Sequence, residues 1–268
     1  MDSARIGSLR ISRFILGSNP FSGFSHQSPE MDLRMKRFFT VARIKAVLHE
    51  AERLGIDTLV ARADHHVIRL LLEYWDEGGR LQWLAQTCPE VGPTELSVRR
   101  AIANGAKGCH VHGGVTDHLL AQGKLGDLQA DLDRIREAGL VAGIAGHNPR
   151  VFEFAEEKLD LDYYMVCYYN PTRRDENPEH PHGAQERYAE EDRRQAIRLI
   201  AGLSRPVIHY KVLAAGRNDP VAAFATAAQA MRANDAVCVG VYPADLPDML
   251  ERDVRLFERS LAAVQGGS

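Results

Sequence analysis

The chain has 268 residues, with 33 Lys and Arg against 36 Asp and Glu, so its net charge is -3. A dedicated nucleic-acid binder would normally be basic, and we therefore expect no nucleic acid as a partner. The chain has no run of about 18 apolar residues, so we expect no membrane span. Residues 1–12 lack the basic-then-apolar pattern of a signal peptide. The four cysteines lie far apart, as in a cytoplasmic protein with reduced thiols.

Short apolar segments alternate with amphipathic ones along the whole chain. Eight of them have the length and composition of strands: 13–16, 58–61, 81–85, 108–112, 140–145, 163–168, 206–212 and 236–241. Helical spacing predicts helices over 41–54, 66–75, 94–104, 128–138, 151–158, 186–203, 221–232 and 246–264. This alternation predicts an α/β fold, a single (β/α)8 TIM barrel over residues 1–268, with a doubly wound open sheet as the alternative.

Turn residues support this division of the chain. Glycine follows four predicted helices, where a left-handed C-cap is needed: Gly55, Gly78, Gly105 and Gly139. Two long irregular segments, 19–39 and 170–185, each follow a strand, so in a barrel both lie over the C-terminal mouth. The second has four basic side chains that could cover a substrate: Arg173, Arg174, His180 and His182.

Alternation along each strand assigns side chains to the interior or to the helices. We place the more apolar side of each strand against the helices, which on 206–212 directs Ile208, Tyr210 and Val212 outward. The mouth is then predicted to collect Arg62, Asp64, Gln86, His112, His147, Asn170, Lys211 and Tyr242, with His110 and His209 one layer deeper. One such side chain could be structural, and Arg62 and Asp64 could simply pair. Together they predict a site, because barrel interiors are normally apolar.

The order of motifs resembles the aldo/keto reductase superfamily, which has a (β/α)8 fold. The segments that carry the resemblance are 16–23 (LGSNPFSG), 55–59 (GIDTL), 112–113 (HG) with the following helix to Gly139, 143–148 (GIAGHN), 168–171 (YYNP) and 235–240 (DAVCVG). Each motif is short, and their order over more than 200 residues is the more specific feature.

The resemblance implies carbonyl reduction with NADP by an Asp, a Tyr, a Lys and a His. Only His112 has a clear counterpart in this chain. The Asp position falls on Val60, the Tyr position near His65 or His66, and the Lys position on Gln86 or Thr87. The acidic segment 243–248 stands where the family has a basic segment that binds the cofactor. The usual proton donor is therefore absent, which argues against NADP.

Two other chemistries are compatible with the predicted mouth. Histidines from three strands could hold zinc, manganese or iron, with Asp64 or Glu90 as an added carboxylate: His110, His112, His147 and His209. Alternatively, a desolvated Lys211 could form a Schiff base, act as a general acid or base, or serve as a fixed cation.

We therefore predict an enzyme for a small polar carbonyl or sugar-like substrate, with lyase, isomerase or hydrolase chemistry. The predicted catalytic residues are His112, Lys211, Asp64, Arg62 and Tyr242. Substrate contacts are predicted for Gln86, Asn170, Asn19 and Arg217, the last as an anion site. The alternatives are a divergent NAD(P)H-dependent reductase and a binding protein without catalysis.

Overall fold

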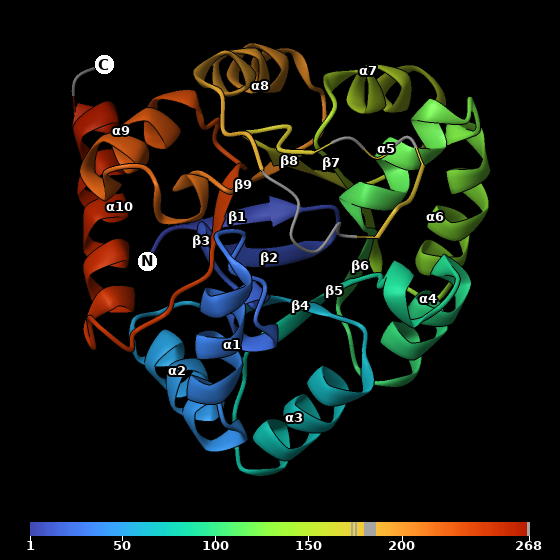
Figure 1. Ribbon diagram of the computed structural model, residues 1–268. Coiled ribbons are helices and arrows are strands. Elements are labelled where there is room, and N and C mark those ends of the chain that lie inside the picture. The colour runs from blue at the N-terminus through green and yellow to red at the C-terminus, as the bar shows by residue number, and fades with distance from the viewer. Residues whose placement is uncertain (173, 175, 180–185, 267–268) are drawn as a thin grey trace.

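Eight parallel strands close into a barrel in the computed structural model, which describes residues 1–172, 174, 176–179 and 186–266 (Figure 1). Neighbours in the ring follow the chain order, and the last strand pairs with the first. The strands are β3 (Phe14–Gly17), β4 (Thr58–Arg62), β5 (Gln82–Gln86), β6 (Gly108–Val111), β7 (Val141–Gly146), β8 (Tyr163–Cys167), β9 (Val207–Tyr210) and β10 (Ala236–Val239). The predicted (β/α)8 barrel is confirmed.

Helices surround the barrel (Figure 1). Those between consecutive strands or after the last are α2 (Val41–Arg53), α3 (His65–Asp76), α4 (Thr94–Ala103), α6 (Leu128–Glu137), α7 (Pro149–Lys158), α8 (Glu190–Gly202), α9 (Pro220–Ala230) and α10 (Met249–Gly266). Two helices were not predicted: α1 (Pro29–Phe38) and α5 (Gly113–Ala121). Short 3-10 turns are η1 (Asn19–Ser22), η2 (Pro89–Val91), η3 (Leu125–Asp127) and η4 (Ala214–Gly216). None of the helices described is long and apolar enough to cross a membrane.

The helix ends follow the local sequence. Each of the four predicted C-cap glycines has a left-handed φ, between 77° and 94°. At the helix starts, Thr40, Asp64, Asn148 and Asp219 each accept a hydrogen bond from a backbone N–H of the first turn. These local signals explain why the element boundaries were predictable.

An N-terminal hairpin, which the sequence analysis missed, closes the bottom of the barrel. It pairs β1 (Ser3–Ile6) with β2 (Leu9–Ser12) in antiparallel register. Its Ala4, Ile6 and Ile11 are buried in the apolar cluster that fills the lower barrel with residues such as Leu84. The polar cavity described below therefore lies at the other, carboxyl end.

The predicted strand faces are confirmed on β4, β5, β6 and β10 and wrong on β9. Ile208 and Tyr210 belong to the interior, whereas Val207 packs in the outer layer with the helices. Both faces of this strand carry apolar residues, so hydrophobicity could not choose between them. Lys211 still reaches the mouth because its φ of 57° interrupts the alternation.

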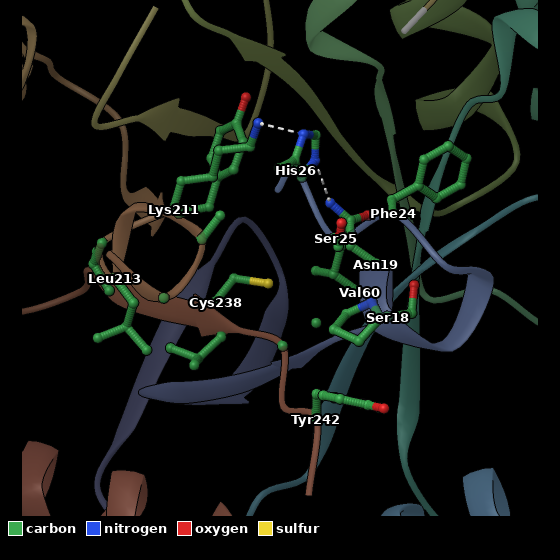
Figure 2. A pocket seen from close by; sticks show the side chains of 18 of the residues that line it. Ser18, Asn19, Phe24, Ser25, His26, Val60, Lys211, Leu213, Cys238 and Tyr242 are labelled. Atoms are coloured by element: carbon green, nitrogen blue, oxygen red, sulfur yellow. Dashed lines mark hydrogen bonds between the residues drawn. The ribbon is translucent and has the colours of Figure 1, made fainter. Parts of the chain in front are cut away.

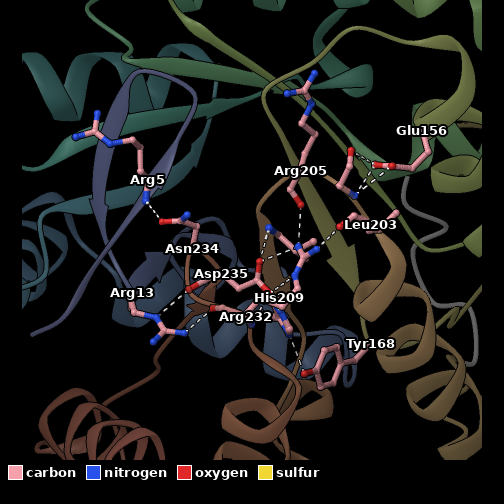
Figure 3. A network of polar contacts seen from close by, with 12 residues as sticks. Arg5, Arg13, Glu156, Tyr168, Leu203, Arg205, His209, Arg232, Asn234 and Asp235 are labelled. Atoms are coloured by element: carbon pink, nitrogen blue, oxygen red, sulfur yellow. Dashed lines mark hydrogen bonds and ion pairs between the residues drawn. The ribbon is translucent and has the colours of Figure 1, made fainter. Parts of the chain in front are cut away.

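His209 therefore lies on the outer side of the barrel, in a buried polar network (Figure 3). Its Nδ1 is 2.9 Å from the Tyr168 hydroxyl, and its Nε2 is 3.4 Å from Asp235. Asp235 also accepts hydrogen bonds from Arg232, and Arg13 donates to the backbone carbonyls of Arg232 and Asp235. We call these five residues the Asp235 cluster.

Candidate active site

A cavity of about 480 Å³ opens at the carboxyl end of the barrel. Its walls come from the loops after β3, β9 and β10 and from side chains at the strand ends (Figure 2). Side chains of α10 also line it. Five of the predicted residues for catalysis or substrate contact line it with Lys211: Arg62, Gln86, His112, Asn19 and Tyr242. The position of the site is the one expected of this barrel type.

Lys211 and His26 meet at one wall of the cavity (Figure 2). Lys211 Nζ lies 3.5 Å from His26 Nδ1, which in turn is 2.7 Å from Glu186 Oε1. On the other side of the ring, Asn19 Nδ2 is 3.4 Å from His26 Nε2. We call these four residues the Lys211 cluster. Their arrangement places an amine and an imidazole at the cavity surface, with a carboxylate behind the imidazole.

Burial changes the protonation of the Lys211 cluster. Desolvation lowers the pKa of Lys211, against the opposing charge of Glu186. Burial alone would raise the pKa of Glu186, but the hydrogen bond with His26 and the charge of Lys211 outweigh it and hold that pKa well below its usual range. No carboxylate oxygen of the described residues lies within ion-pair distance of Lys211 Nζ, so its amine is directed to the cavity and to His26.

Backbone strain gathers at the same wall. All four non-glycine residues with positive φ in the described chain lie there: His26 (56°), Lys211 (57°), Ala214 (50°) and Ala215 (54°). Such conformations cost about 1–3 kcal/mol each and persist where the surrounding structure imposes them. The strain therefore marks this wall as a place where side-chain position is maintained at the expense of stability.

Contacts between the two loops hold the strained backbone. Gln27 Nε2 donates to the Ala215 carbonyl at 2.8 Å, and Arg217 donates to the His26 carbonyl at 2.9 Å. The Arg217 guanidinium also lies over the Tyr188 ring. Arg217 does not line the cavity, and two of its donors fix the loop, so its predicted role as an anion site stays a prediction.

A second hydrogen-bonded group lies across the cavity. His147 Nδ1 is 2.6 Å from Asp117 Oδ2, and its Nε2 is 3.3 Å from the Tyr210 hydroxyl. A Cβ on Gly113 would stand 2.9 Å from the His147 ring, so glycine leaves the room that the ring occupies. Burial lowers the pKa of His147, although Asp117 opposes the shift. Asp117 fixes the ring orientation and leaves the opposite nitrogen toward Tyr210.

His112 also presents a defined nitrogen to the cavity. The Gly114 N–H donates to its Nδ1 at 3.1 Å, so the ring proton belongs on Nε2. Burial lowers the pKa of His112, and the positive charges of Arg174 and Arg62 add to this effect. A neutral ring with Nε2–H is a hydrogen-bond donor for a substrate oxygen.

The Arg62 side chain connects two carboxylates at the far wall. Its Nε lies 2.9 Å from Asp64 and its Nη2 lies 3.2 Å from Glu90, and its guanidinium packs over the Phe24 ring. Asp64 also caps α3 by accepting from the Val67 N–H, and it does not line the cavity. The interpretation of Asp64 as a partner of Arg62 therefore fits better than the predicted catalytic role.

Arg174 adds a positive charge to the cavity. Its side chain is 5% exposed and lines the opening, while Nη1 donates to the Glu179 carbonyl. Residues 173, 175 and 180–185 of the same segment lie outside the described residues, so the roles suggested for Arg173, His180 and His182 stay predictions.

The predicted four-histidine metal site is wrong. Of these four histidines, only His112 and His147 line the cavity. His110 is buried in the barrel interior with its Nδ1 3.1 Å from the Tyr163 hydroxyl, and His209 lies in the Asp235 cluster. Among the residues described, no group of three or more His, Cys, Asp or Glu is placed to hold a metal ion. His209 is lost as a ligand because β9 turns it to the outer side of the barrel, and His110 because its ring contacts the Tyr163 hydroxyl.

Other differences concern the loop after β8. Asn170 does not line the main cavity, and its N–H donates to Asp192. The sequence predicts a helix from residue 186, but α8 begins only at Glu190, and the Glu186 side chain is 4% exposed beside His26. Nothing in the sequence pairs His26 with Glu186, which are 160 positions apart.

Comparison with known proteins gives a structural likeness only. No family model matches the chain, and no curated protein sequence matches it. A putative aldo-keto reductase from Pseudomonas aeruginosa superposes with a TM-score of 0.66 at 18% identity, over 97% of this chain and 96% of that one. An aldo-keto reductase from Bacillus halodurans in its holo form gives 0.62 at 13% identity, over 99% and 96%.

A truncated 3-deoxy-D-arabino-heptulosonate 7-phosphate synthase from Thermotoga maritima gives a TM-score of 0.58 at 12% identity, over 98% and 93% of the two chains. The fold is aldo/keto-reductase-like. In this aldo/keto-reductase-like barrel, His65 and His66 begin α3 and are exposed, and Val60 and Gln86 line the cavity. The aldo/keto-reductase-like fold is thus combined with a different set of polar groups, since a fold does not by itself fix a function.

Proposed function

We propose that this protein is an enzyme that uses the Lys211 amine to form an imine with a small polar carbonyl substrate, in a lyase or isomerase reaction. The observation that carries the proposal is the Lys211 cluster, where a half-buried amine faces a cavity beside a hydrogen-bonded imidazole and carboxylate. A lysine becomes a nucleophile when desolvation lowers its pKa, because the neutral amine is then accessible near neutral pH.

The covalent step balances within the cavity. The Lys211 nitrogen attacks the carbonyl carbon, and the carbonyl oxygen takes two protons, one from that nitrogen and one from an acid, and leaves as water. The resulting protonated imine draws electrons from an adjacent bond. A C–H bond breaks with its proton passing to a base, or a C–C bond breaks with release of a carbonyl fragment. Protonation of the product carbon and hydrolysis of the imine release the product and restore the amine. No oxidant or reductant is required.

Three groups of this chain can serve these steps. The His26–Glu186 pair lies next to the amine and can accept its proton as the nitrogen attacks. The Nε2–H of His112 can donate to the carbonyl oxygen as charge develops on it. Arg174 gives the cavity a positive charge, which suits a substrate with a carboxylate or phosphate group.

Borohydride trapping tests the proposal. The protein is incubated with glyceraldehyde, dihydroxyacetone, pyruvate or glyoxylate in the presence of cyanoborohydride, and the intact mass and peptide map are then measured. We expect at least one compound to label Lys211, and no label at that position in Lys211→Met. Lys124→Met is the matched control, because Lys124 is exposed. Labelling that is spread evenly over exposed lysines would refute the proposal.

A divergent NAD(P)H-dependent reductase is the second candidate. The specific observation in its favour is His112, which the family resemblance assigns to the carbonyl group and which lines the cavity. Its proton donor would have to come from a group such as Tyr210, since the resemblance provides none at the usual positions. Quenching of nicotinamide fluorescence on titration of NADPH with the protein distinguishes the two candidates, because the imine mechanism needs no nicotinamide.

A further inference from the structure

The cavity extends away from Lys211 along one face of α10. Met249, Arg252, Asp253 and Leu256 all line it. Their spacing of three and four residues places them on one side of the helix. A stretch of α10 is thus turned toward the cavity rather than toward the packed core. We call this part of the cavity the α10 arm.

Asp253 is the polar group of this helix face that is least exposed. It is 6% exposed, yet it lines the cavity. No hydrogen bond or ion pair to its carboxylate is present in the part of the chain that the structure describes. Arg252, on the same helix face, is exposed, so solvent screens its charge. A mostly buried carboxylate without a protein partner is satisfied by what fills the cavity, water or a ligand.

The surroundings of Asp253 have the same implication. Desolvation raises its pKa to about 7, and Arg252 offsets only part of this effect. Apolar side chains complete the arm, with Met249 and Leu256 on α10 and Pro220 and Val239 from the neighbouring elements. The arm therefore combines apolar walls with one carboxylate that accepts hydrogen bonds when ionised.

We propose that the α10 arm is a binding site for a primary ammonium group on an apolar body, with the ammonium donating to Asp253. An ammonium is the complementary partner because it provides charge and up to three donors to an acceptor-only group. The apolar body would replace water against Met249, Leu256 and Val239. This site stands independently of the proposed imine chemistry, since it uses neither Lys211 nor His26.

The test uses 4-fluorobenzylamine as the probe and 4-fluorobenzyl alcohol as its uncharged counterpart, with binding followed by fluorine NMR at pH 8. We expect the amine to bind the full chain at least about tenfold more tightly than the alcohol, the difference that one charge-assisted hydrogen bond provides. Asp253→Asn should remove that difference. Asp245→Asn removes the same charge from an exposed carboxylate at the cavity and should change the affinity less than about twofold.

Several outcomes would overturn the proposal. Equal binding of the amine and the alcohol would mean that Asp253 does not recognise the charge. An equal loss in Asp253→Asn and Asp245→Asn would indicate general electrostatic attraction rather than a site. Asp253→Leu gives a second variant, expected to bind the alcohol in preference to the amine. Lys211→Met should retain amine binding, so failure of the imine proposal and failure of this one are distinguishable.

Discussion

The Asp235 cluster and the Lys211 cluster are both built from ionisable side chains of several barrel elements, yet they differ in what their polar atoms face. In the Asp235 cluster, His209 and Asp235 are almost fully enclosed and bonded to protein groups. In the Lys211 cluster, the amine borders an open cavity and the backbone is strained. The difference teaches that a buried polar group does not by itself mark a site. A polar group that faces a cavity does.

The largest expected effect is on stability, in the Asp235 cluster. Asp235→Ala should lower the free energy of unfolding by about 3–5 kcal/mol, because it leaves a buried network without its central charge. Burial alone would raise the pKa of Asp235, but hydrogen bonds from His209 and Arg232 hold it well below its usual range. The stability that ionised Asp235 contributes is therefore complete above about pH 4, the pKa of an Asp in the unfolded chain. It is lost as the pH falls through the lower pKa that Asp235 has in the folded protein.

Urea unfolding at pH 7 and at lower pH measures this loss. Asp245→Ala is the control, since its exposed ion pair with Arg34 should contribute less than about 1 kcal/mol. A small loss in Asp235→Ala, similar to that of the control, would mean that the Asp235 cluster is not the structural element we describe. Labelling of Lys211 should persist in the folded variant.

Asp253 should behave in the opposite way, because it belongs to the cavity. Its folded pKa of about 7 lies above the unfolded value, so its burial costs stability as the pH rises from about 4 to 7. Asp253→Asn should therefore raise the free energy of unfolding at pH 8 by up to about 4 kcal/mol, at about 1.4 kcal/mol per tenfold change in proton affinity. The gain should vanish near pH 4. A loss of stability at pH 8 would show that protein groups satisfy this carboxylate.

Gly113 tests how tightly the cavity side chains are held. Gly113→Ala should cost about 1–3 kcal/mol, because the new Cβ would contact the His147 ring that Asp117 fixes. Gly126→Ala is the matched control, since a Cβ there meets nothing within 4 Å. Thermal unfolding of the two variants compares them. Equal stability would mean that His147 moves freely within the cavity.

The smallest expected effect concerns the strained wall. Ala215→Gly should stabilise the protein by about 1 kcal/mol, because glycine adopts its φ of 54° without the steric cost that alanine bears. Ala222→Gly, at an exposed position inside α9, should instead cost about 1 kcal/mol. Chemical unfolding of both variants measures whether each change raises or lowers the free energy of unfolding. A loss in Ala215→Gly would argue that the wall is unstrained.

The fold was predictable from the sequence because its signals are local. Three signals each depend on a few neighbouring residues. They are the cap glycines, the helix-capping side chains, and the alternation of strand-like and helix-like hydrophobic patterns. The hairpin was missed because Ala4, Ile6 and Ile11 are few apolar residues in a polar segment. The predicted orientation of β9 was wrong because both faces of this strand are apolar. The contacts that decide it are those of His209 with Tyr168 and Asp235, which come from distant segments.

The site was predictable only in part, for the same physical reason. Strand ends meet at the barrel mouth whatever the loops do, and Arg62 and His112 line the cavity there as the strand alternation predicts. Lys211 lines it too, but only because its positive φ interrupts the alternation. The partner of Lys211 is His26, from a loop about 185 residues away, and the partner of His26 is Glu186. Such contacts depend on loop conformation and strained backbone, for which a single sequence carries no periodic signal.

The measurement that tests the central claim most directly is the titration of Lys211 in the folded protein. Protein with 13C-labelled lysine is followed by NMR from pH 5 to 11, and the Lys211 signal is assigned by its absence in Lys211→Arg. We expect a Lys211 pKa clearly below the usual value of about 10.4, because burial disfavours its charged form. A Lys211 pKa at or above that value would contradict the account, since the amine would then be an ordinary cation and not a nucleophile.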